Sequence, residues 1–158
     1  MTDLESSSNG VLRADEVTLT YQDGRNTVYA VKDVSLTIAA GEFVGILGPS
    51  GSGKTSLLYV LSGIRPPALG RVVLNGQLIN APGVSREAIR RRYFGFIFQQ
   101  YNLIPSIDAA SNAAVPLIAQ GMDRFEARER AVAMLEKLNI GDQADKLPRQ
   151  LSGGQQQR

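Results

Sequence analysis

Residues 48–55 read GPSGSGKT and match the pattern G-x-x-x-x-G-K-[ST]. In such a loop, glycines let successive backbone N–H groups curl around phosphate oxygens, where a Cβ atom would collide. The lysine reaches the β- and γ-phosphates, and the threonine hydroxyl is placed to bind Mg²⁺. The sequence therefore predicts a site for nucleotide phosphates and Mg²⁺. We assign to it Gly48, Pro49, Ser50, Gly51, Ser52, Gly53, Lys54, Thr55 and Ser56.

The segments on either side of the loop are those that the motif requires. Phe43–Leu47 is a short, nearly continuous apolar run, which predicts a strand buried on both faces of a parallel sheet. Leu57–Leu61 predicts a short apolar helix, and Gly63 is placed to end it. A glycine-rich turn without a ligand is the alternative. The predicted strand and helix favour phosphate binding, because the helix adds the positive end of its dipole.

Further strands are predicted on both sides of this unit. Val11–Tyr21 alternates apolar and polar residues, and a second strand region follows a polar turn and covers Val28–Ile38. Arg71–Ile79 contains the pair Asn75-Gly76, which is typical of a β-hairpin. Residues 1–10 are polar and predict a flexible leader with no features of a secretory signal.

The last third of the chain has a helical pattern. The alanine-rich stretch 106–120 predicts a helix that Pro116 should kink or interrupt. Asp123 and Glu126 form a capping-box pattern at the start of the next helix, and Gly141 is expected to close it. The order of elements is thus strands, a strand–loop–helix unit, more strands, and then a helical insert.

Residues 151–155 read LSGGQ and present a second motif. Ser152 and Gln155 stand in capping-box relation, so the plain interpretation is the capped start of a helix. That interpretation leaves Gly153 and Gly154 unexplained, because adjacent glycines lower helix stability. A serine and two glycines at a helix N-terminus also offer a hydroxyl, N–H groups and a dipole to an anion. Two such cradles indicate either two phosphate sites or one site shared between two chains.

With both motifs in view, the chain resembles the ATPases of ABC transporters. The loop at residues 48–55 resembles their Walker A motif, residues 151–155 their signature motif, and Phe98–Pro105 their Q-loop region. Tyr21 matches the aromatic residue on which these proteins stack adenine. The resemblance covers about residues 11–158, with the motifs in family order. The sequences of Leu151–Arg158 and Phe96–Pro105 point to the branch of lipoprotein-releasing and macrolide-exporting ATPases, to which a cell-division ATPase is related.

The resemblance implies a role for each matching residue, with ATP and Mg²⁺ as the cofactors. Tyr21 would stack on adenine, although an ordinary aromatic at a strand end is the alternative. Gln99 would bind Mg²⁺ and the attacking water and would sense a membrane partner; otherwise it is a solvated loop residue. Ser152, Gly153, Gly154 and Gln155 would contact the γ-phosphate held by the opposite subunit, in a head-to-tail dimer.

The implied fold is α/β, a P-loop NTPase of the ABC ATPase type. It would consist of an incomplete parallel core sheet, an antiparallel β subdomain and a helical subdomain at about residues 103–150. The family also places an acidic residue in the segment after the Q-loop, where this chain has Ser111 and Asn112. That departure concerns the contact with a membrane domain.

The family's later motifs have no counterpart in residues 1–158. These are the Asp-Glu pair after an apolar strand (Walker B) and the switch histidine, and the pair Asp15-Glu16 lacks the preceding apolar run. We therefore expect these 158 residues alone to bind ATP weakly and to hydrolyse it very poorly, for want of a carboxylate to orient water. Truncation of a longer protein is the favoured explanation, and a naturally short, non-hydrolysing variant is the rival.

Composition narrows the function classes further. The chain has no cysteine and no histidine, which excludes disulfides, thiolate metal sites and histidine bases. The net charge is +2, and the basic run Arg90–Arg92 is interpreted as a solvated helix end, so no nucleic acid partner is expected. The apolar runs of the chain are too short to span a bilayer, so any membrane role is expected to be peripheral. The resemblance to ABC ATPases implies a place on the cytoplasmic face of the inner membrane.

The expected partners are a membrane permease and a second copy of the subunit, with export favoured over uptake. The alternative is a non-transport ABC ATPase, either of the cell-division type or a soluble regulator. A small GTPase-like switch shares only the phosphate loop and would prefer guanine nucleotides.

Overall fold

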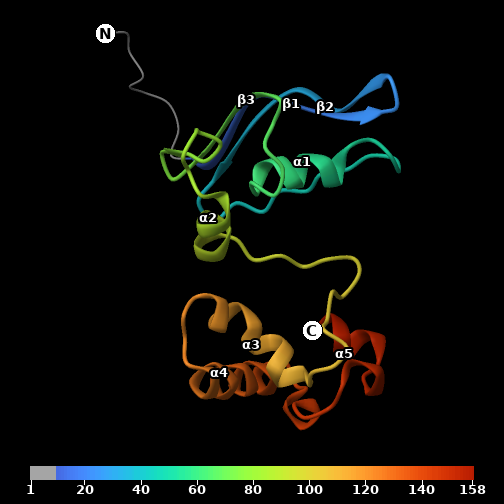
Figure 1. Cartoon of the computed structure of the whole chain (residues 1–158), viewed down its shortest axis with the longest axis vertical. Helices are drawn as coiled ribbons and strands as arrows, with labels where there is room; N and C mark the ends of the chain where they lie inside the picture. The colour runs from blue at the N-terminus through green and yellow to red at the C-terminus, as the bar shows by residue number, and fades with distance from the viewer. Residues whose placement is uncertain (1–9) are drawn as a thin grey trace. The chain divides into compact units, whose positions relative to one another are not determined.

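The computed structural model describes residues 10–158, and the chain divides into two compact units that meet in sequence between Phe94 and Gly95. Figure 1 shows the strands in the first unit, with the helices α3, α4 and α5 in the second. Most of the predicted leader, residues 1–9, lies outside the described residues. Gly10, which the sequence assigned to that leader, instead begins the first strand and pairs with Ala39.

The first unit is built on a four-stranded antiparallel sheet with the order β2-β1-β3-β4. Its strands are β1 (Gly10–Asp23), β2 (Asn26–Ala39), β3 (Leu69–Leu74) and β4 (Gln77–Leu78). The predicted hairpins are confirmed: β1 pairs with β2, and Asn75-Gly76 connects β3 to β4. The register of β1 shifts near Glu16, a non-glycine residue with φ 49°.

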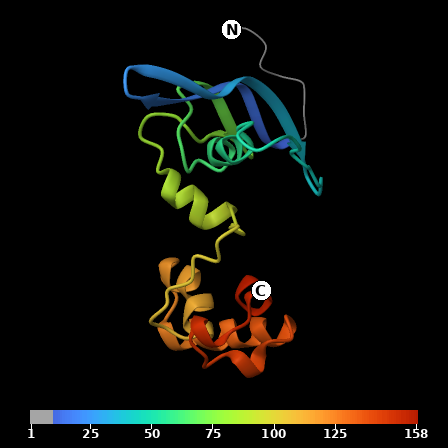
Figure 2. The same cartoon turned by 90° about the vertical axis from the view of Figure 1, so that its right-hand side faces the viewer.

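Helices α1 (Lys54–Leu61) and α2 (Arg86–Tyr93) supply apolar side chains to the core beneath this sheet. In Figures 1 and 2, α1 lies along one face of the long β1–β2 hairpin. The helix ends as predicted, with Gly63 just beyond its last turn, but it begins at Lys54, three residues before the predicted start at Leu57. The buried core residues are Leu12, Ala14, Val17, Leu19, Val31, Val60, Leu61, Val72, Leu74, Ile79 and Ile89.

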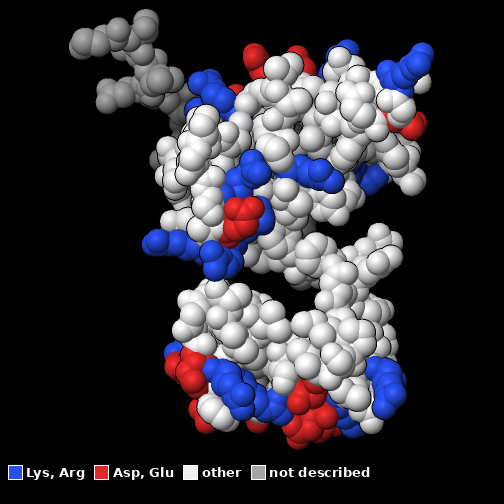
Figure 3. Space-filling view, in the orientation of Figure 1, with Lys and Arg blue, Asp and Glu red and all other residues white. Residues whose placement is uncertain are grey.

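The run Arg90–Arg92 forms the last turn of α2, as expected of a helix end. Arg90 donates to the backbone oxygen of Gly63 at 2.6 Å, and Arg92 lies over the ring of Tyr93. Side chains of both charge signs are interspersed on the face shown in Figure 3.

The predicted strand Phe43–Leu47 is not formed. These residues lie outside the sheet, and the side chains of Phe43 and Leu47 are 98% and 94% exposed. The apolar segment Phe94–Phe98 is likewise no strand. A parallel strand makes no hydrogen bonds within itself, so it needs a neighbour to pair with. Among residues 10–158 neither segment has one, and the parallel part of the predicted core sheet is absent there.

The second unit is helical. It contains α3 (Ala109–Ala119), α4 (Arg124–Lys137), the 3₁₀ turns η1 (Gly141–Gln143) and η2 (Pro148–Gln150), and α5 (Gly153–Gln157). Two small cores hold it together, both rich in alanine, which lets α3 and α4 pack closely. Within the part of the chain that the structure describes, no helix has the length and apolar character needed to cross a membrane.

Two details of these helices differ from expectation. Pro116 does not interrupt α3, which continues to Ala119. Asp123 caps α4 as predicted, accepting from the amides of Phe125 and Glu126. The helix nevertheless ends at Lys137, before Gly141, because the chain turns at Asn139 with φ 58°. Asparagine tolerates this left-handed conformation and ends the helix in place of glycine.

Candidate functional site

The phosphate loop is held against the sheet at Gly53, the residue before α1. Gly53 has φ 87°, and its backbone oxygen accepts from the amide of Leu57 at 2.8 Å to begin the helix. A Cβ atom at this position would lie 2.1 Å from the backbone oxygen of Ala30 in β2. The loop therefore reaches the sheet edge with no room for a side chain, which explains why its last glycine is required.

The ammonium group of Lys54 lies over the loop. Its Nζ donates to the backbone oxygens of Gly48 at 2.9 Å and Pro49 at 2.6 Å, and lies 3.4 Å from the Oγ of Ser52. The backbone amides of Lys54, Thr55 and Ser56 open the first turn of α1 and have no intrahelical acceptor. A positive charge and a set of amide donors thus meet at one end of a helix, which is suitable for a phosphate group.

Tyr21 lies near the end of β1, opposite Val28 of β2, and its side chain is 36% exposed. The guanidinium of Arg65 is 5.9 Å from the centre of its ring. Tyr21 belongs to the same unit as the loop. An exposed ring beside a cation offers a face on which a flat, electron-rich group can stack.

The acidic pair Asp15-Glu16 is used in the sheet. Asp15 forms ion pairs with Arg13 at 3.2 Å and Arg71 at 3.8 Å, while the amide of Glu16 donates to the Oγ of Ser35. Both residues lie within β1, at its register shift. This placement gives the pair a structural role in joining β1 to its neighbours.

The signature residues lie in the second unit and form the predicted capping box. The Oγ of Ser152 accepts from the amide of Gln155 at 3.3 Å, and the Oε1 of Gln155 accepts from the amide of Ser152 at 2.8 Å. Gly153 and Gly154 are exposed in the first turn of α5. Gln99 is exposed in the segment between α2 and α3.

Asn112, which stands where the resemblance leads one to expect an acid, closes the loop before α3. Its Oδ1 accepts from the amide of Ile104 at 2.7 Å. Its Nδ2 lies 3.1 Å from the backbone oxygen of Ile104, 3.0 Å from that of Ile107 and 3.1 Å from that of Asp108. A carboxylate could accept the first bond but would face three oxygens without a proton to donate. The structure therefore accounts for the amide, a role that the sequence did not indicate.

We expect Asn112→Asp to lower the free energy of unfolding of the second unit by about 1–3 kcal/mol at neutral pH, because a carboxylate would face three carbonyl oxygens to which it cannot donate. The measurement is urea unfolding followed by circular dichroism. Asn102→Asp makes the same chemical change at an exposed loop position and is the control. The difference between the variants should shrink below about pH 4, where the new carboxyl carries a proton. Equal stabilities at pH 7 would contradict the assignment.

Arg128 ties α4 to the ends of two other segments. Its guanidinium contacts Asp108, the N-cap of α3, at 2.8 Å, and Asp145 at 2.5 Å, and it also donates to Ser111. Burial raises the pKa of Asp108, but hydrogen bonds from Ser111 and the pairing with Arg128 outweigh burial and hold that pKa below its ordinary value. The carboxylate form of Asp108 is thus favoured where it caps the helix.

Among the predicted site residues, the structure brings together Gly48–Ser56 and places Tyr21 in the same unit. Gln99 and Ser152–Gln155 share the second unit. Each group thus lies within a single unit. Asn112 and Arg128 support the second group, and their signal in the sequence is weak, since each is a single polar residue in a helix.

Comparison with known proteins shows the family to which the chain belongs. Residues 31–158 match the family model described as ABC transporter. The chain is 44% identical over 149 residues to the macrolide export ATP-binding/permease protein MacB of Brucella abortus (strain 2308), and to MacB 1 of Yersinia pestis bv. Antiqua (strain Antiqua). Each alignment covers 94% of this chain and 23% of the relative, so the chain spans about a quarter of the length of these curated proteins.

Solved structures give the same result. The dimeric structure of an ATP-binding cassette in a post-hydrolysis state, bound to ADP and Pi, superposes with a TM-score of 0.83 at 39% identity. The superposition covers 92% of this chain and 65% of the solved one. A dimeric bacterial ABC transporter cassette superposes equally well at 40% identity and the same coverage. The predicted α/β P-loop fold of the ABC ATPase type is confirmed. The chain belongs to the ABC transporter family, within its ATP-binding cassette.

Proposed function

We propose that this chain binds ATP with Mg²⁺ as part of an ATP-binding cassette which, in a head-to-tail dimer, couples binding and hydrolysis of ATP to a membrane permease that exports its substrate. The observation that carries the proposal is the position of Lys54, whose ammonium lies over the loop beside the amides of the first turn of α1, which have no intrahelical acceptor. These groups suit a phosphate chain, in which negative charge is spread over several oxygens.

The loop residues Gly48–Ser56 fit the phosphates, and Thr55 and Gln99 offer the hard oxygen ligands that Mg²⁺ prefers. When bound, the metal ion neutralises charge on the phosphate oxygens. Lys54 would leave the loop carbonyls to contact the β- and γ-phosphates. Tyr21 would stack on adenine. The guanidinium of Arg65 lies over the tyrosine ring and would place a positive charge beside the base.

The second half of the site would come from another copy of the chain. Ser152, Gly153, Gly154 and Gln155 would contact the γ-phosphate held by the partner's loop. The solved dimers of related cassettes support this arrangement, and one of them holds ADP and Pi. ATP binding would close such a dimer and hydrolysis would reopen it.

The relatives named for macrolide export support a transport role, because their names join an ATP-binding part to a permease in one protein. We infer that this chain works beside a permease at the cytoplasmic face of the inner membrane, and that it exports or extracts amphiphilic molecules. Retention of the chain by membranes that contain the permease, and its absence from membranes without it, would test this part of the proposal.

Nucleotide binding is tested directly by titrating the chain with Mg·ATP while following the backbone amide NMR signals of residues 48–56. We expect weak, saturable binding, and Lys54→Ala should weaken it by about 100-fold, since the variant loses a charge-assisted contact to two phosphates. Lys137→Ala, an exposed lysine in the last turn of α4, is the control and should bind normally.

If the Lys54→Ala variant binds Mg·ATP as tightly as the Lys137→Ala variant, the assignment of residues 48–56 to phosphate binding is refuted. A competition between ATP and GTP separates the ABC ATPase from the GTPase-like alternative. Clear preference for the guanine nucleotide would favour the GTPase-like alternative over an ABC ATPase.

A further inference from the structure

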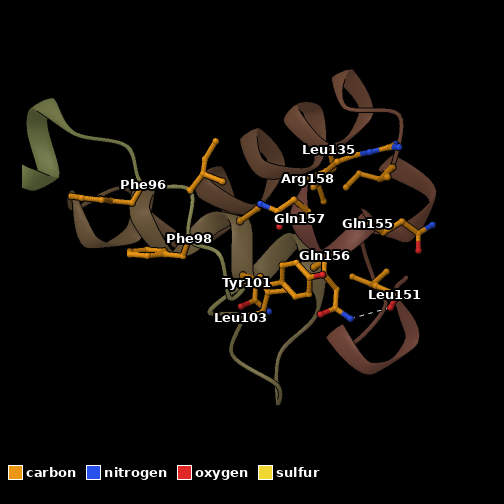
Figure 4. Close-up of a pocket in the computed structure, with 15 residues that line it drawn as sticks. Phe96, Phe98, Tyr101, Leu103, Leu135, Leu151, Gln155, Gln156, Gln157 and Arg158 are labelled. Atoms are coloured by element: carbon orange, nitrogen blue, oxygen red, sulfur yellow. Dashed lines mark hydrogen bonds between the residues drawn. The ribbon is translucent and has the colours of Figure 1, made fainter. Parts of the chain in front are cut away.

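Tyr101 lies against the first turn of the signature helix. A Cβ atom built on Gly153 would lie 3.0 Å from the hydroxyl oxygen of Tyr101 and 3.9 Å from its Cζ. Figure 4 shows the ring of Tyr101 beside Gln156, in a cavity of about 250 Å³ whose wall also includes Leu103 and Leu151. The segment after Gln99 therefore contacts α5 directly, within one unit.

The chain that carries Tyr101 is anchored on its C-terminal side. Asn112 bonds to Ile104, three residues after Tyr101, through both its oxygen and its nitrogen. The amides of Ala109 and Ala110 donate to the backbone oxygens of Lys146 and Ala144, each at 2.9 Å. The segment that follows Tyr101 is thus tied to the segment that leads to the signature residues.

Glutamine side chains brace the signature segment from within. Gln150 accepts from the amide of Leu147 at 2.8 Å, and Gln155 accepts from that of Ser152 at 2.8 Å. Gln156 donates to the backbone oxygens of Pro148 at 2.9 Å and Leu151 at 3.0 Å. Residues 101–112 and residues 147–156 are therefore each held by internal hydrogen bonds, and the two segments meet where Tyr101 lies against Gly153.

We propose that Tyr101 is a positioning residue whose ring sets the spacing between the Gln99 segment and the first turn of α5, so that the two move together. The meaning of this link rests on the proposed function, in which Gln99 faces metal and permease and Ser152–Gly154 contact nucleotide. The contact itself does not depend on nucleotide. Its loss would let Gln99 shift without shifting Ser152.

The first test uses the whole chain without nucleotide. Tyr101→Leu should change the amide NMR signals of Gly153 and Gly154 and speed hydrogen exchange of the Gln155 and Gln156 amides, which bond to Ser152, by about tenfold. Tyr101→Phe, which keeps the ring, should restore protection. Tyr93→Leu removes a tyrosine of similar exposure, 45% against 42%, and should leave these signals unchanged. Unaltered signals in Tyr101→Leu would overturn the proposal.

The second test uses the close approach of the hydroxyl. Gly153→Ala should change hydrogen exchange of the Gln155 and Gln156 amides by about tenfold in the wild-type background, because the new methyl group would lie 3.0 Å from the hydroxyl of Tyr101 and one of the two must shift. In the Tyr101→Phe background the nearest ring atom is Cζ, and the same substitution should change exchange about twofold at most. Equal effects in the two backgrounds would show that Tyr101 does not set the spacing.

These tests are separate from the nucleotide titration. If Mg·ATP fails to bind while the Tyr101 and Gly153 variants behave as described, the link stands and the nucleotide function fails. If binding is normal while these variants leave α5 unchanged, the link alone is refuted.

Discussion

Gly53→Ala is expected to disrupt the phosphate loop and abolish nucleotide binding. The new Cβ would lie 2.1 Å from the backbone oxygen of Ala30, and neither atom belongs to a flexible side chain that could move aside. The left-handed φ of 87° adds about 1–2 kcal/mol for an L-residue. Because the backbone of β2 or the start of α1 must shift, we expect a total loss of about 4 kcal/mol or more in the stability of the first unit.

Gly51→Ala is the matched control for this substitution. Gly51 lies in the same loop with nearly the same φ, 81°, but a Cβ atom there would have nothing within 4 Å. Its cost should be limited to the backbone conformation, about 1–2 kcal/mol, and the loop should keep its place on the sheet. Urea unfolding of both variants is the measurement, because a side chain at Gly51 could also disturb bound phosphate and so would not be a neutral change in a nucleotide titration. Similar losses in the two variants would show that the contact with Ala30 is not what requires glycine.

The second large effect is expected at Gly70 in β3, far from the loop in sequence. Gly70 has φ 88°, and a Cβ atom there would lie 2.4 Å from the backbone oxygen of Glu16 and 2.5 Å from that of Asp15. This is the point where β1 shifts its register against β3. Gly70→Ala must therefore open the centre of the sheet, and we expect it to destabilise the first unit by about 3–5 kcal/mol.

Gly76→Ala is the control for Gly70→Ala, since Gly76 has φ 78° in the β3–β4 turn with open space around it. The strand signal in circular dichroism should be lost at lower urea in Gly70→Ala than in Gly76→Ala. Equal urea midpoints for the strand signal in Gly70→Ala and Gly76→Ala would contradict the assignment of this large effect to the contact between Gly70 and the backbone of β1.

Local patterns in the sequence were sufficient for most of the individual elements. The β1–β2 hairpin, the Asn75-Gly76 turn and the capped starts of α4 and α5 depend on residues within a few positions of one another. Propensity and capping act at this range, so they can be read without knowledge of the fold. Phe43–Leu47 shows the limit of this approach. Its apolar run suits a buried strand, but a strand exists only where a neighbour pairs with it.

The candidate site divides in the same way. The motif at residues 48–55 predicts a phosphate loop because its glycines, Lys54 and Thr55 suit phosphate and Mg²⁺ through the loop itself. Asn112 could not be interpreted locally. It looked like a departure from the family pattern, but its four contacts to the backbone of residues 104–108 depend on how the loop folds back onto α3.

By itself, then, the sequence determined the glycine-rich loop before α1, the capped start of α5 and the hairpins, because glycine, proline, capping residues and alternating side chains act over a few residues. Only the tertiary structure decided that Gly53 must fit against Ala30, that Gly70 must fit against the register shift of β1, and that Tyr101 touches Gly153. Each of these contacts joins residues more than 20 positions apart. Their spacing is set by the packing of whole segments, which no short pattern of residues encodes.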